Sequence, residues 1–148
     1  MFAFMKTCLI FVSLRLKEYM TTYSMGRELC KDILKTQHPD NEAKLFTVRY
    51  LMAASKSYEK DPSEALNTYY ALLKQVDGKL KQEPAEPSQI NHTRARDAMA
   101  IEVVEMFGLM PAADNYVAKY IMLSSELIRV HLYTRKDEAK AERPEVFL

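Results

Sequence analysis

Apolar side chains recur every three to four positions along most of the chain, which is the period of a helix with one buried side. The pattern predicts helices over residues 24–37, 41–58, 62–79, 89–107 and 112–136. Short polar turns separate the first three segments, so neighbouring helices are expected to pair as antiparallel hairpins. With only three Gly and no alternating β-branched runs, the predicted fold is an all-α bundle of five to six helices in a single domain.

The clearest local signal is the start of the third helix. Asp61 is a good N-cap residue, Pro62 suits the first helical position, and Glu64 stands at the third. This order is typical of a capping box, in which two side chains satisfy the unpaired N–H groups of the first turn.

The segment 112–136 is the longest without a helix breaker, and its apolar side chains cover an arc of about 200°. A surface helix needs a narrower stripe, so we expect this helix in the middle of the bundle or beneath a partner. Ser124 and His131 lie inside the arc, two turns apart. They are interpreted as a buried pair in which each finds one partner, or as a small polar site with His131 as base or pH switch.

The first 20 residues allow three interpretations. They can form an amphipathic helix packed on the bundle, an extension upstream of a true start at Met20 or Met25, or a helix on a membrane surface. A signal peptide is not favoured because no small-residue cleavage site follows the apolar run. The remaining chain divides into a helical bundle, 21–137, and a charged tail, 138–148.

Composition narrows the function classes. The formal net charge is +1, and basic side chains outnumber acidic ones only in the first 37 residues, so the whole chain offers no strong field for nucleic acid. Cys8 and Cys30 are far apart and among apolar neighbours, which favours reduced, packed thiols and a cytoplasmic protein. The scattered Cys and His residues have no metal-ligand spacing, and no cofactor motif is present.

One short stretch suggests nucleic-acid binding. Residues 103–109, Val-Val-Glu-Met-Phe-Gly-Leu, resemble the first helix and turn of a helix-turn-helix DNA reader. The resemblance covers under twenty residues, and Asp114 stands where that motif has an aliphatic residue. Under this interpretation Arg94, Arg96 and Lys119 are the candidate nucleic-acid contacts.

An enzyme is the third class. It would use His131 as a base with Ser124, Glu102 or Glu105. Glu102 and Glu105 share a face but lack the E-x-x-H partners of a di-metal bundle, so a solvated face is the better interpretation. Neither a nucleophile elbow nor a Gly-rich phosphate loop is found.

The first-ranked hypothesis is therefore a non-enzymatic interaction module, such as a small regulator, inhibitor or assembly adaptor. Its expected partner is another protein or a second copy of the chain, with a membrane least favoured. Nine Met and nine Tyr suit adaptable interfaces. The candidate interface residues are Tyr116, Tyr120, Met122, Tyr133, Val146 and Phe147.

Overall fold

The computed structural model describes residues 2–39, 41–82 and 115–142, with side chains for 5–39, 41–82 and 115–134. These residues form helices α1 (Phe2–Arg15), α2 (Tyr19–Leu34), α3 (Asn41–Lys56), α4 (Ser63–Gln82) and α6 (Tyr116–Glu142). The all-α prediction is confirmed for this part of the chain, which contains no strand. The predicted helix at 89–107 and the stretch 103–109 that resembles a helix-turn-helix lie outside the described residues.

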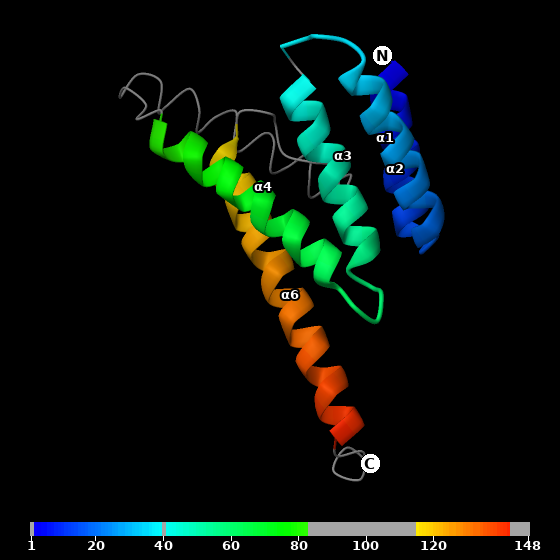
Figure 1. Ribbon diagram of the computed structural model, residues 1–148, viewed down its shortest axis with the longest axis vertical. Coiled ribbons are helices and arrows are strands. Elements are labelled where there is room, and N and C mark those ends of the chain that lie inside the picture. Colours follow the sequence, from blue (N-terminus) through cyan, green and yellow to red (C-terminus); the bar gives the residue numbers. More distant parts are fainter. Residues whose placement is uncertain (1, 40, 83–114, 143–148) are drawn as a thin grey trace.

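Successive helices run in opposite directions. Figure 1 shows α2 and α3 side by side, with α4 returning from the α3–α4 turn and α6 crossing behind it. The last turns of α6 extend beyond that turn, away from the other helices. No helix within the described residues is long and apolar enough to cross a membrane.

Helix α3 is the centre of the bundle. One cluster of buried side chains joins α1, α2 and α3: Ile10, Leu29, Ile33, Leu45, Val48 and Leu51. A second joins α3, α4 and α6: Phe46, Ala53, Ala65, Tyr69, Leu72, Val76, Leu123, Leu127 and Val130. Of the two places predicted for 112–136, the middle of the bundle is wrong, because among the described helices α3 carries the two buried sides and α6 packs mainly on α4. The alternative, a surface helix beneath a partner, stays a prediction.

The N-terminal residues form α1, which packs on α2 and α3 through the buried side chain of Ile10. Lys17 ends the helix in the left-handed region, at φ 62°. The backbone N–H of Glu18 bonds to the carbonyl of Ser13 (2.9 Å) and that of Lys17 to Leu14 (3.0 Å), which is the Schellman pattern. The buried hydroxyls of Ser13 and Thr22 then join α1 to α2 at 2.8 Å.

Two predicted helix starts had different outcomes. Asp61 caps α4 as expected, since its Oδ1 accepts the backbone N–H of Ser63 at 3.1 Å. Glu64 instead accepts a hydrogen bond from Tyr23 Oη at 2.8 Å, so this carboxylate serves tertiary packing. Helix α2 begins at Tyr19, five residues before the predicted Ser24, because Thr22 is buried inside the helix and bonds back to the carbonyl of Glu18 (2.9 Å).

Candidate protein-interaction surface on helix α6

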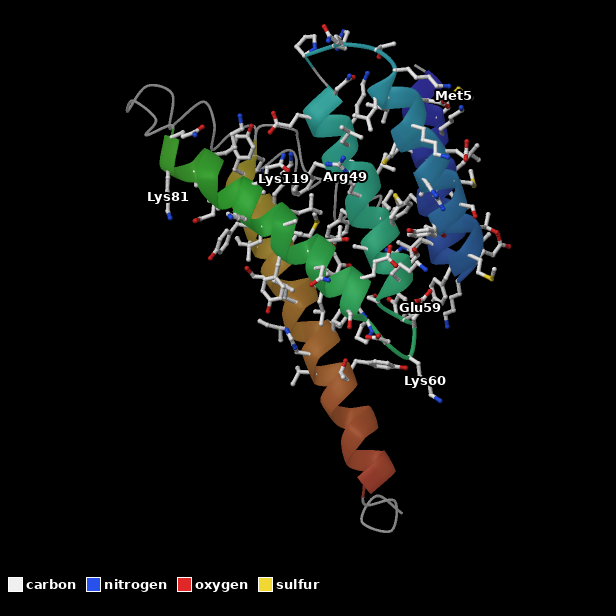
Figure 2. The ribbon with its side chains drawn as sticks, in the orientation of Figure 1. Met5, Arg49, Glu59, Lys60, Lys81 and Lys119 are labelled. Carbon is white, nitrogen blue, oxygen red and sulfur yellow. The ribbon has the colours of Figure 1, made fainter. Side chains whose placement is uncertain are left out.

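The charged side chains of α6 between residues 116 and 134 are turned toward the other helices. Lys119 is only 3% exposed. Its ammonium group lies 4.3 Å from the centroid of the Phe46 ring and 5.5 Å from that of Tyr116. Figure 2 places Lys119 where α4 crosses α6, beside α3. The prediction that Lys119 contacts nucleic acid was therefore wrong, because a phosphate cannot reach this buried ammonium.

Glu126 and Arg129 form the second inward group. Tyr69 Oη, fully buried on α4, donates to Glu126 Oε2 at 2.8 Å. Arg129 Nη2 donates to the same oxygen at 2.7 Å and to Ser57 Oγ at 2.7 Å. These charge-assisted bonds tie α6 to α4 and to the end of α3.

The same network changes the acidity of its members. Burial raises the pKa of the Tyr69 phenol above its ordinary value, and the negative charge of Glu126 raises it further. Burial alone would lower the pKa of Arg129, but its hydrogen bond and charge pairing with Glu126 outweigh this and raise the pKa. Tyr69 therefore stays neutral while Glu126 and Arg129 form an ion pair.

An aromatic stack continues the network to α2. The Arg129 guanidinium lies 4.8 Å from the centroid of the Tyr58 ring. Tyr58 stacks on Tyr19, with ring centroids 4.7 Å apart and planes at 15°. Such cation–π and stacked contacts add to the ion pair, so the inward side of α6 is held by specific polar groups as well as by aliphatic packing.

The opposite side of α6 is aliphatic and open to solvent. Four side chains within an arc of about 60° are 55–61% exposed: Val117, Ile121, Ile128 and Leu132. We call these four residues the α6 outer face. None of the charged side chains in 116–134 is exposed, since Lys119 is buried and Glu126 and Arg129 are half-buried. The helix therefore has charges inside and aliphatic groups outside, the reverse of an ordinary surface helix.

The predicted buried pair, Ser124 and His131, was wrong. His131 is exposed and Ser124 is half-buried. The side chains of α6 that point into the core are instead Leu123, Leu127 and Val130. Around the helix axis, His131 lies roughly 80° from the centre of these three residues, at the solvent boundary. There its Nε2 lies 3.1 Å from Tyr70 Oη of α4, so the pair does not form one site.

The predicted interface residues are divided among three places. Tyr120 is exposed at the border of the α6 outer face, and Tyr133 is exposed on another side of the helix. Tyr116 and Met122 are half-buried and pack against the core shared by α3, α4 and α6. The predictions for the remaining candidates concern residues outside the described part of the chain: Val146, Phe147, Arg94, Arg96, Glu102 and Glu105.

The sequence missed the α6 outer face because its aliphatic residues were assigned to the core. A usable signal was present. Lys119, Glu126 and Arg129 share one side of the helix, and three charges on one narrow side can mark a buried polar network as well as a solvated surface.

A second exposed apolar stripe lies on α1, formed by Met5, Leu9, Val12 and Leu16. It differs from the α6 outer face because exposed Arg15 and Lys17 stand beside it. Met5, at its beginning, lies on the far side of the bundle from α6 (Figure 2).

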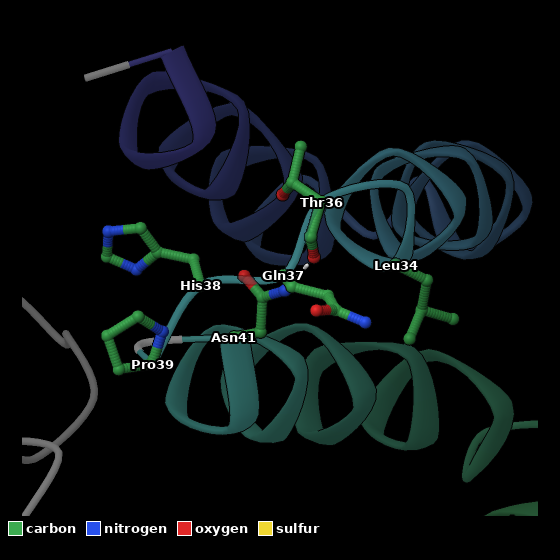
Figure 3. A pocket seen from close by; sticks show the side chains of 6 residues that line it. All are labelled: Leu34, Thr36, Gln37, His38, Pro39 and Asn41. Carbon is green, nitrogen blue, oxygen red and sulfur yellow. Dashed lines mark hydrogen bonds between the residues drawn. The ribbon is translucent and has the colours of Figure 1, made fainter.

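Open pockets lie elsewhere on the described residues. One of about 510 Å³ lies at the α2–α3 loop and is lined by Leu34, Thr36, Gln37, His38, Pro39 and Asn41 (Figure 3). The Asn41 amide points into the loop and donates to the carbonyl oxygens of Ile33 (3.1 Å) and Thr36, so it closes the loop.

Another pocket, of about 440 Å³, lies between α2 and the end of α3 beside Tyr23 and Lys56. The Lys56 ammonium is held by Glu59 at 3.0 Å and Glu64 at 3.8 Å. It also lies 4.3 Å from the centroid of the Tyr23 ring. The cation of this cavity is thus engaged by its own neighbours. Within the described residues, no group of three or more His, Cys, Asp or Glu side chains could hold a metal ion.

Comparisons with protein-family models, with curated proteins and with solved structures gave no match. The functional argument therefore rests on the geometry of α6.

Proposed function

We propose that this chain is a non-catalytic helical interaction module that binds another protein surface through the α6 outer face. The observation that carries the proposal is the inversion of α6. Four aliphatic side chains are exposed in a row while the charged groups of the same segment point inward. Contiguous exposed apolar surface of this kind marks an interaction site more often than a free surface.

The chemistry of the face favours a protein over a phosphate-rich partner. Nucleic acid and anionic membrane surfaces are bound by Lys and Arg side chains, and the exposed side chains of residues 116–134 include neither. Protein interfaces, in contrast, are depleted of charge at their centre and enriched in aromatic residues. Tyr120, at the border of the face, fits that composition.

The free energy of burying these side chains is large enough for a single substitution to test the proposal. Full burial of an Ile or Leu side chain is worth about 1.5–3 kcal/mol, so each half-exposed residue can still contribute on the order of 1 kcal/mol. A charge placed among these side chains would be buried without a partner, which costs several kcal/mol. One Ile→Glu substitution should therefore be enough to abolish binding.

The test is size-exclusion chromatography with light scattering on the full chain, with the ratio of absorbance at 260 and 280 nm recorded across the peak. If the partner is a second copy of the chain, we expect a species heavier than one chain with a protein-like ratio. Ile128→Glu should convert it to a monomer. The matched control is Leu9→Glu on α1, because Leu9 and Ile128 are 56% and 61% exposed, and it should leave the mass unchanged.

Two outcomes would contradict the proposal. Co-eluting nucleic acid that persists in Ile128→Glu would favour nucleic-acid binding. An assembly lost in Leu9→Glu but kept in Ile128→Glu would move the interface to α1.

A further inference from the structure

We propose that the partner of the α6 outer face is a second copy of this chain, with the two α6 helices antiparallel and related by a two-fold axis between Ser124 and Ser125. The inference rests on the proposed function and deepens it. It assigns the partner, the direction of pairing and the register.

The sequence of α6 is symmetric about that point. Three positions before Ser124 stands Ile121, and three positions after Ser125 stands Ile128. Val117 stands seven positions before Ser124, and Leu132 stands seven positions after Ser125. A two-fold axis that reverses one helix against the other therefore places Ile121 opposite Ile128, and Val117 opposite Leu132.

These offsets are also the ones that helix pairing requires. Steps of three and four residues keep side chains along one seam between two helices. The four residues span 15 helical steps, which is about 22 Å at 1.5 Å per residue. A symmetric two-fold interface must be self-complementary, and this face meets the requirement residue by residue.

The centre of the seam is small. Ser124 and Ser125 flank it on either side, where bulky residues would hold the helices apart. The Ser125 hydroxyl already donates to the carbonyl oxygen of Ile121 at 2.9 Å, so pairing would leave no orphaned donor at this position. Two small side chains thus allow close approach of the helices, and the hydroxyl of Ser125 is already hydrogen-bonded within its own helix.

Electrostatics agree with a self-complementary contact. An isologous interface pairs the face with a copy of itself, so an exposed charge beside the two-fold axis would meet the same charge on the other chain. The exposed face between 116 and 134 carries none. Its uncharged surface thus suits a copy of itself.

The expected affinity is modest. The face is about four helical turns long, with Tyr70 of α4 exposed at its edge beside His131. Four aliphatic side chains on one helix form a small surface compared with stable interfaces, which bury about 1,200 Å² or more in total. We therefore expect a reversible dimer whose population depends on concentration.

Cysteine cross-linking tests the direction and the register. In a Cys8→Ala, Cys30→Ala background, Ser125→Cys should form a disulfide-linked dimer on mild oxidation with copper phenanthroline, because both copies of residue 125 lie beside the axis. Ile121→Cys alone should not, since its two copies would be offset by seven residues, or about 10 Å. Mixing Ile121→Cys with Ile128→Cys chains should restore the cross-link. Thr21→Cys, exposed on α2, is the control for random collision.

Each failure has a distinct meaning. Self-linking of Ile121→Cys would indicate parallel helices and overturn the inference while the proposed function stands. A monomer at all concentrations whose Ser125→Cys thiol reacts rapidly with maleimide would also overturn it and leave a different protein as partner. A monomer in which that thiol reacts slowly would mean that the chain's own residues cover the face, and both proposals would fall.

Discussion

At the scale of single residues, Tyr69 makes the stability of the protein sensitive to alkaline pH. Its phenol is fully buried and bonded to Glu126, and burial together with that charge raises its pKa above the ordinary value of about 10. Burial likewise raises the pKa of Tyr50, whose ring lies 5.6 Å from that of Tyr69. The folded state thus holds both phenols in the neutral form.

The sign of the pH effect follows from that preference. Below about pH 10 both states are protonated and the contribution to stability is complete. Above it the unfolded chain releases the protons first, so unfolding becomes easier by about 1.4 kcal/mol per pH unit for each phenol. We expect the free energy of unfolding in urea to fall above pH 10, and the advantage of the wild type over Tyr69→Phe to shrink by that amount per unit. If the free energies of unfolding of the wild type and Tyr69→Phe fell in parallel above pH 10, this account would be contradicted.

At the scale of elements, two helical glycines make opposite predictions. A Cβ at Gly78 of α4 meets nothing within 4 Å, whereas one at Gly26 of α2 overlaps Met52 Cγ and lies 3.5 Å from Val48 Cγ1. Gly78→Ala should stabilise by about 0.5–1 kcal/mol through helix propensity. Gly26→Ala should destabilise by about 1 kcal/mol, because α2 and α3 approach closely there and repacking costs more than the propensity gained.

Urea unfolding of both variants measures the contrast. Met52→Ala provides the internal control, since it should cost less in the Gly26→Ala background than in the wild type if the overlap with Met52 is the cause. Equal costs in the two backgrounds would place the effect elsewhere.

Local signals in the sequence predicted the elements better than their orientation. The periods of α3 and α4 and the Asp61 cap depend on residues within a few positions of one another, and they appear in the structure. The side of α6 that faces inward depends instead on α4, where Tyr69 binds Glu126 from 57 residues away in the sequence. Aliphatic residues occur on most sides of α6, so the helical period could not predict that Leu123 faces the core and Ile121 faces solvent.

At the scale of the whole molecule, the proposed pairing of two chains through α6 would couple folding to association. A dimer that forms only from folded chains stabilises them by mass action, so its melting temperature rises with protein concentration. For a chain of 148 residues, a hundredfold increase in concentration should raise the midpoint by about 3–5 °C. The measurement is thermal unfolding followed by circular dichroism across that range.

Two variants separate this coupling from other causes of a higher midpoint. Ile128→Glu should melt at one temperature at all concentrations, because the glutamate would be buried without a partner in the paired helices. Leu9→Glu should retain the wild-type dependence, since α1 lies outside the proposed interface. A wild-type midpoint that does not move over the hundredfold range would mean that the α6 outer face contributes nothing to stability through a second copy.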